Sequence, residues 1–195
     1  ILAGEGPLMK DLVEISDHDF NSVNTVSIGI IFVIMLFVLK SISLPVILMA
    51  VIEFAIFINM GIPYYTGTIL PFIASIVIGT IQLGATIDYA ILITTTYITN
   101  RKNGQNKNEA VSNALESSIG SIVVSGLCFF GATFGVGVYS KIEMIGSLCT
   151  LMSRGAIISM VCVICILPAF LLLCDKLICK TTIGMRKITD SKAEK

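Results

Sequence analysis

The chain alternates long apolar runs with short polar stretches, and five of the runs are long enough to set the topology. A helix that crosses a hydrocarbon core of about 30 Å needs about 20 mostly apolar residues, at 1.5 Å of rise per residue. The pattern therefore predicts an all-α fold, a polytopic membrane bundle of five transmembrane helices. The predicted transmembrane domain, residues 24–173, has spans at about 24–39, 44–61, 70–98, 119–138 and 145–173.

Three stretches lie outside these predicted spans. Residues 1–23 place an irregular apolar stripe opposite several acidic side chains, which indicates a short water-exposed segment. Residues 106–118 predict a short helix on the membrane surface, because Val111 and Leu115 belong to an apolar stripe. This helix is either a plain linker or a coupling helix that moves with the spans on both sides. Residues 174–195 form a polar tail.

Basic side chains are spread unevenly among the loops. They follow the first, third and fifth spans, and the alternate loops carry few of them. Lysine and arginine gather on the cytosolic side of membrane proteins, so we expect residues 1–23 to be extracytoplasmic and the C-terminus to be cytosolic, in a multi-pass protein of the cell membrane. The residues that fix this orientation are Lys40, Arg101, Lys102, Lys107, Lys176, Lys180, Arg186 and Lys187.

The composition indicates that lipid surrounds most of the chain, and it also argues against several classes of function. Hydrophobic residues make up 55% of the chain, and 13 basic residues balance 13 acidic ones, which gives no argument for a nucleic-acid partner. The six cysteines are interpreted as small packing residues, although Cys174 and Cys179 at the predicted interface are also palmitoylation candidates. No HExxH motif and no Ser/His pair occurs within the spans, so we expect neither an enzyme, nor a metal site, nor a cofactor.

The third predicted span carries an acid in its interior. Asp88 lies about ten residues before the end of that span, which puts it about 15 Å from the membrane surface. A mid-helix Asp costs about 2.5–3.5 kcal/mol on insertion, so an intramembrane acid is a functional-site hypothesis by default. Tyr89 follows with a phenol that can donate or accept, and Gly84, one turn earlier, permits close approach of another helix. We interpret Asp88 as a carboxylate that handles protons in a transporter.

Two other ionisable residues fall inside spans, Glu53 and Arg154. Burial favours the neutral form of Asp88, whereas a neighbouring Arg154 would favour its ionised form, and a reversible proton site would alternate between the two. The alternative is a permanent ion pair of Arg154 with Asp88 or Glu53 that only holds helices together.

The fourth span presents small side chains at three- and four-residue spacing, among them Ser121 and Ser125. Such a stripe allows helices to approach closely and supplies hydroxyls for interhelical hydrogen bonds. A second interpretation is that the stripe faces Asp88 and, together with Thr95, lines a proton path.

At this point the motifs resemble a known family. Residues 84–89, Gly-Ala-Thr-Ile-Asp-Tyr, are followed by Tyr97, by Glu109-Ala110-Val111, by Gly120 and by Leu167-Pro168-Ala169. This pattern is similar to the MMPL branch of the resistance–nodulation–division (RND) transporters, over essentially the whole chain from Gly4.

The resemblance implies an architecture. Each half of such a transporter has one span, a large extracytoplasmic porter domain and five further spans. This chain then corresponds to the five-span block of one half, with residues 1–23 as the end of the porter domain. The position of its end favours the C-terminal half.

The resemblance also implies a function. Asp88 and Tyr89 would act in a proton relay between the halves, with protons as the coupling ion, to export lipids or other hydrophobic compounds. The partners would be the bilayer, the other half with its porter domains, and a lipidic substrate. Arg154 matches no motif of the family. The alternative function is a non-transporting membrane module that binds lipid or sterol, or acts as a scaffold.

Overall fold

The computed structural model describes residues 5–67 and 72–182, and every regular element within them is a helix. Five of the helices are long and apolar enough to cross a membrane, so the prediction of an all-α bundle with five transmembrane helices is confirmed. The helices are α1 (Glu5–Leu39), α2 (Ser43–Thr66), α3 (Phe72–Lys102), α4 (Lys107–Tyr139), α5 (Glu143–Leu173) and the short α6 (Asp175–Thr181).

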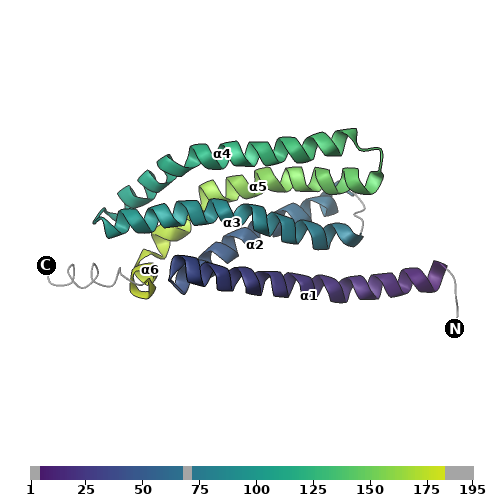
Figure 1. Ribbon diagram of the computed structural model, residues 1–195, viewed down its shortest axis with the longest axis horizontal. Coiled ribbons are helices and arrows are strands. Elements are labelled where there is room, and N and C mark those ends of the chain that lie inside the picture. Colours follow the sequence, from purple (N-terminus) through teal and green to yellow (C-terminus); the bar gives the residue numbers. More distant parts are fainter. Residues whose placement is uncertain (1–4, 68–71, 183–195) are drawn as a thin grey trace.

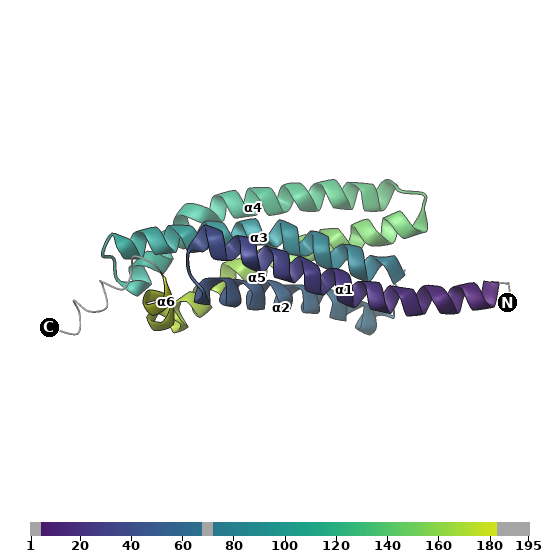
Figure 2. The same cartoon turned by 60° about the horizontal axis from the view of Figure 1, so that its bottom comes forward.

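The five long helices lie roughly along one direction (Figures 1 and 2). α4 and α5 form a hairpin with the most extensive contact in the bundle, and α3 packs against both of them. α2 packs against α5 and α3. α1 makes its main contacts with α3 and α2, and its N-terminal part extends past the other helices (Figure 1).

The core is centred on α2 and α3. Half of the residues in the most apolar window of each of these helices are buried, against 11% for α1 and 17% for α4. Met35 of α1, Leu48 and Ile52 of α2, Ile93 of α3 and Leu167 of α5 belong to one apolar cluster. α1 and α4 therefore leave most of their apolar surface outside the core, where lipid or another protein surface would cover it.

Local sequence explains several helix ends. Pro45 lies in the first turn of α2, where its missing N–H costs nothing. Helix α2 passes the predicted end of its span and contains Pro63, then stops at Gly67, whose φ of +65° is the left-handed conformation that glycine adopts easily. At the start of α4, the Glu109 carboxylate accepts a hydrogen bond from the Asn106 N–H at 3.4 Å.

Two predicted boundaries differ from the structure. Residues 106–118 are not a separate surface helix, because Lys107–Tyr139 is one continuous helix. At 1.5 Å per residue its 33 residues extend about 50 Å, more than a bilayer core. Its apolar stripe, including Val111 and Ala114, packs into the bundle instead of lying on a membrane surface. Likewise, α1 runs without a break from Glu5 into the first span.

The start of the predicted polar tail, residues 174–195, also differs from expectation. Residues 175–181 form α6, which buries Ile178 and Cys179 in the core. The remaining tail, residues 183–195, lies outside the described residues. The assignments of residues 1–23 to a porter domain and of the tail to the cytosol stay predictions.

Candidate functional site

Asp88 lies on the outer surface of the bundle. Its side chain is exposed and makes no hydrogen bond or ion pair with the described residues. Gly84, one turn earlier on α3, is also exposed, and a Cβ added there would meet no atom within 4 Å. Asp88 is therefore midway along its helix, as predicted, but its side chain lies on the outside of the bundle and not in the core.

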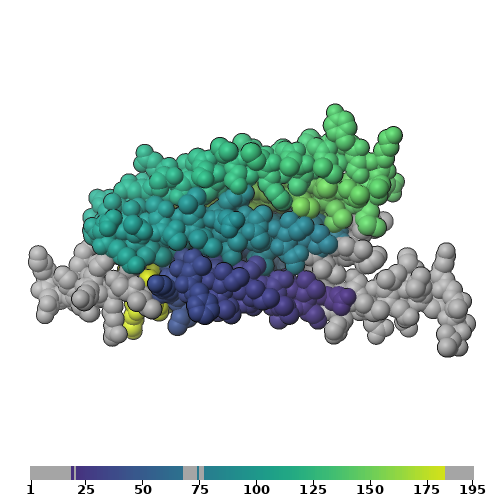
Figure 3. Space-filling model, viewed as in Figure 1, coloured from purple at the N-terminus to yellow at the C-terminus, as the bar shows by residue number. Residues whose placement is uncertain are grey.

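Tyr89 points the other way and joins α3 to α4. Its side chain is 8% exposed, and its hydroxyl donates to the Ser125 Oγ at 3.5 Å. Ser125 and Ser121 are exposed on α4. Helices α3 and α4 run next to each other on the surface seen in Figure 3. We call the exposed strip formed by Gly84, Asp88, Ser121 and Ser125 the Asp88 face.

Thr95 follows Asp88 by two helical turns and is half-buried. Its hydroxyl donates to the carbonyls of Ile91 at 2.8 Å and Leu92 at 3.1 Å, in the preceding turn of its own helix. This bonding is common for threonine in membrane helices. The role of Thr95 in a proton path stays a prediction.

Arg154 bonds to neither intramembrane acid. Its Nε donates to Asn59 Oδ1 at 3.0 Å, and its Nη2 donates to the Asn59 backbone carbonyl at 2.9 Å. No ion pair with Asp88 or Glu53 is formed within the described part of the chain. In this structure α2 supplies an amide and a carbonyl that satisfy the guanidinium without a second charge. A pairing of Arg154 with Asp88 or Glu53 in another conformation stays a prediction.

Asn59 belongs to a buried polar network that links α2, α3 and α5. Its Nδ2 donates to Gln82 Oε1 at 2.8 Å, and Gln82 Nε2 donates to Ser159 Oγ at 3.2 Å. Asn59 is fully buried. An unsatisfied polar group in such surroundings costs about 1–3 kcal/mol, so the network has to be complete to stabilise the bundle.

Gly155 makes room for this network. A Cβ at that position would lie 2.6 Å from Asn59 Nδ2 and 2.7 Å from Gln82 Oε1, closer than atoms can approach. The sequence pattern did not lead us to expect Asn59 and Gly155 at a polar network. The available signal was an amide side chain within an apolar run, which calls for a partner on another helix.

Glu53 is partly buried on α2 and is not part of the Asp88 face. Its Oε1 is buried and has no hydrogen-bond partner among the described residues. The structure does not bring Glu53 together with Asp88 or Arg154 as an ion pair.

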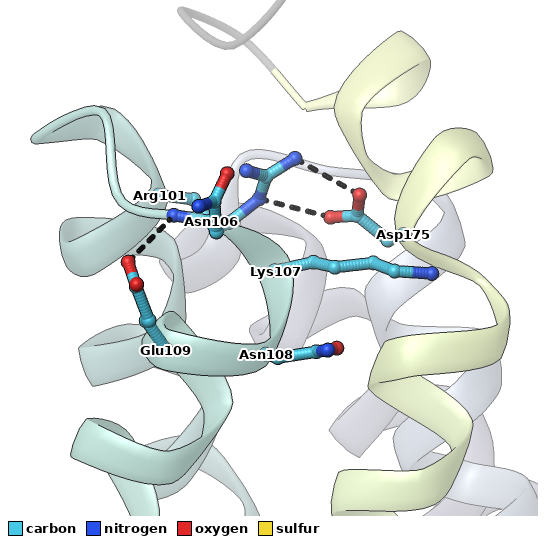
Figure 4. A pocket seen from close by; sticks show the side chains of 6 residues that line it. All are labelled: Arg101, Asn106, Lys107, Asn108, Glu109 and Asp175. Atoms are coloured by element: carbon cyan, nitrogen blue, oxygen red, sulfur yellow. Dashed lines mark hydrogen bonds and ion pairs between the residues drawn. The ribbon is translucent and has the colours of Figure 1, made fainter.

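A second acid, Asp175 on α6, was read from the sequence as part of a polar tail and lies in a closed cluster. Arg101 donates from Nε to Asp175 Oδ1 at 3.0 Å and from Nη2 to Oδ2 at 2.9 Å (Figure 4). The buried Tyr97 hydroxyl donates to Oδ1 as well. Burial, and then the Asp175 charge, raise the pKa of the Cys179 thiol. We call Tyr97, Arg101, Asp175 and Cys179 the Asp175 cluster.

Next to this cluster is a pocket of about 500 Å³. The bonded pair Arg101 and Asp175 forms one part of its lining, and Asn106, Lys107, Asn108 and Glu109 of the α3–α4 turn and the start of α4 complete it (Figure 4). Two cations and two carboxylates balance in the lining, so the pocket does not select an ion by charge. Among the described residues, no three His, Cys, Asp or Glu side chains form a group that could hold a metal ion.

Comparison with known proteins gives one result. A family model described as the MMPL family matches residues 1–190, which includes all six helices and the Asp88 face. No curated protein matches the chain.

Proposed function

Since the chain belongs to the MMPL family, a branch of the RND transporters, we propose that it is the transmembrane part of an exporter driven by the proton motive force. The proposed cargo is a lipid or another hydrophobic compound, and Asp88 with Tyr89 acts in the proton relay. The observation that supports this proposal best is the exposed carboxylate of Asp88, which lies on a mid-span surface and has no partner among the residues that the structure describes.

An acid in that position does not tolerate lipid on its own. A charged side chain in hydrocarbon costs several kcal/mol, so intramembrane acids generally face a protein interior or a water-filled cavity. The Asp88 face also carries small side chains, Gly84, Ser121 and Ser125, which permit a second helix to approach closely. In the proposed transporter the other half covers this face, and Asp88 becomes an interior residue of the whole protein.

The proton step then follows from a change in surroundings. Asp88 is neutral when the covered face is dry and ionised when polar groups or water reach it, since desolvation and hydrogen bonding act on its charge in opposite directions. One charge that crosses 100 mV gains about 2.3 kcal/mol, enough to bias two conformations that differ by a similar free energy. The Tyr89 hydroxyl donates to Ser125 on α4, and this bond fixes the position of the phenol next to Asp88 in the sequence.

The relay proposed here does not include Arg154. Its guanidinium is bonded to Asn59, and moving it to Asp88 would leave buried amide and carbonyl groups without a partner. Arg154 and the Asn59 network instead keep α2, α3 and α5 in fixed positions, which gives α3 a rigid support on the side away from the Asp88 face.

The test uses the full-length transporter in liposomes under an imposed pH gradient. Asp88→Asn keeps the side-chain volume and removes the titratable group, so we expect it to abolish proton-linked movement of a fluorescent hydrophobic dye. Glu116→Gln is the matched control, because it neutralises an exposed carboxylate on α4 away from the Asp88 face.

Proton-linked movement that survives Asp88→Asn in folded protein would refute the relay. If the wild-type protein binds lipid without moving protons, and Asp88→Asn leaves that binding intact, the chain is instead a lipid-binding or scaffolding module.

A further inference from the structure

A groove at the turn between α1 and α2 combines three kinds of side chain that together suit an amphipathic ligand. Its volume is about 630 Å³, and Thr181 of α6 is part of its lining. Figure 2 shows α6 near the turn between α1 and α2. The apolar wall consists of Leu36, Phe37 and Ile42, and the polar lining of Lys40, Ser41 and Thr181. Binding sites for small molecules have volumes of about 300–1,000 Å³, so the groove is of the right size for a lipid headgroup and the first part of its chains.

The cation in this groove stands where a glycine is expected. Lys40 ends α1 with a φ of +49°, and its N–H donates to the Leu36 carbonyl at 3.0 Å. This is a left-handed helix cap, a position that disfavours residues with a Cβ and is usually filled by glycine. A lysine there carries a conformational cost that its exposed side chain does not recover through any contact with the described residues. The ammonium group is therefore available to an anionic ligand in the groove.

Ser41 adds a hydrogen-bond donor at the same place. Its side chain is buried, and its Oγ accepts a hydrogen bond from the Thr182 hydroxyl at 3.0 Å. Ser41 also lines the groove, so its hydroxyl can donate to a ligand there while its oxygen accepts from Thr182. An ammonium and a hydroxyl donor side by side fit the oxygens of a phosphate diester.

The apolar wall is exposed on the outside of the bundle. Phe37 is 78% exposed and Ile42 is 68% exposed, and both lie within three residues of Lys40 in the chain. This end of the bundle also carries most of its lysines, which the positive-inside rule places in the cytosolic leaflet, the leaflet with anionic lipids. A phospholipid in this leaflet would place its phosphate at Lys40 and its acyl chains along Phe37.

We propose that this groove is a binding site for an anionic phospholipid, held by Lys40 and Ser41 through its phosphate and by Leu36, Phe37 and Ile42 through its chains. The site is separate from the Asp88 face and does not depend on the proposed proton coupling. Because the groove is lined by α1, the α1–α2 turn and α6, a bound lipid would hold that turn against the α6 helix.

Native mass spectrometry of the full-length protein in detergent tests the site with added phosphatidylglycerol and phosphatidylcholine. Wild-type protein should retain more phosphatidylglycerol. Lys40→Gly should abolish that preference, a roughly fivefold loss of binding for one lysine near an anionic headgroup. It should also leave the melting temperature unchanged or raise it, since glycine relieves the positive φ. Lys40→Arg should retain the preference.

Lys176→Gln is the matched control, because Lys176 is exposed on α6 at the same end and does not line the groove. An equal loss in Lys40→Gly and Lys176→Gln would mean general surface attraction and would overturn the site. Displacement of phosphatidylglycerol by the same concentration of glycerol 3-phosphate would overturn it as well, since the apolar wall would then contribute nothing. Equal binding of phosphatidylglycerol and phosphatidylcholine to the wild-type protein would also overturn the site, since the proposal requires a preference for the anionic lipid.

Discussion

Asp175 and Asp88 are both carboxylates of a largely apolar helix bundle, and their surroundings are opposite. Asp175 is 8% exposed and accepts hydrogen bonds from Tyr97 and from two nitrogens of Arg101. Asp88 is exposed and bonds to none of the described residues. Both acids are connected to helix α3. Asp88 lies in the middle of this helix, and Asp175 bonds to Tyr97 and Arg101 on its last turns. One end of α3 is therefore fastened to α6, while its middle presents an open face.

The difference separates structural polar groups from functional ones. A buried charge that is fully paired holds elements together, and removing one partner leaves the other uncompensated. A charge on an apolar surface contributes nothing to its own chain and acquires a role only when something covers it. By this criterion the Asp175 cluster and the Asn59 network belong to the scaffold, whereas our proposal assigns the Asp88 face to an interface.

The largest expected loss of stability is that of Asp175→Asn, which tests the buried and paired acid of the two. The substitution leaves the buried Arg101 guanidinium without a counter-charge, and breaking such a pair costs about 3–5 kcal/mol. Denaturant unfolding of the purified full-length protein in detergent measures the loss. A cost below about 1 kcal/mol would mean that water solvates the pair, and the contrast with Asp88 would disappear.

Gly155→Ala and Gly84→Ala apply the same comparison to two glycines. The added methyl group at Gly155 would overlap Asn59 and Gln82, and overpacking of this kind costs about 1–3 kcal/mol. At Gly84 it meets nothing within 4 Å, so the helix should be unaffected or gain up to about 1 kcal/mol. Unfolding of both variants measures the difference. Equal costs at the two positions would show that the Asn59 network has room to adjust.

The features that could be predicted from the sequence are those that depend on the residues of a single helix. Five apolar runs predicted five spans, and the structure has five helices long and apolar enough to cross a membrane. The role of Asp88 stays a prediction. Hydropathy also explains the errors at the ends of the elements. The segment over 106–118 was separated from the fourth span because its polar residues look like a loop, yet helical hydrogen bonding continues through Gly120 into the apolar part.

Contacts between helices could not be predicted in the same way. Arg154 had two acids as candidate partners by charge, and the structure gives it Asn59, because the crossing of α2 and α5 decides which side chains meet. Asp175 follows the last span and looks like a solvated residue, until α6 folds back and meets Arg101, 74 residues earlier in the chain. Neither pairing leaves a periodic signal in one sequence.

Asp88→Asn should change stability little in spite of its effect on transport. The side chain bonds to none of the described residues, and surface substitutions of this kind stay within about 0.5 kcal/mol. The free energy of unfolding in detergent, measured for Asp88→Asn and Asp175→Asn under the same conditions, compares the two acids directly. A loss of several kcal/mol at Asp88 would show that the acid already supports the fold, which would make it a scaffold residue like Asp175.

The reactivity of Cys179 gives the finest measure of how closed the Asp175 cluster is. Burial and the Asp175 charge raise the pKa of this thiol, so the folded state holds its proton more tightly than the unfolded state does. The resulting stabilisation is fully present below the usual thiol pKa of about 8.5 and is lost as pH rises through the raised value. Because the thiolate is the reactive form, maleimide should label Cys179 slowly at pH 7 to 9.

Asp175→Asn should accelerate this labelling, since it removes the negative charge that helps to raise the Cys179 pKa and loosens the cluster around the thiol. Asp88→Asn should leave the rate unchanged, because its face lies elsewhere on α3. Peptide mass spectrometry over a pH series quantifies both rates. If the two variants label alike, α3 transmits changes from its middle to its end, and the division into a fixed end and an open face no longer holds.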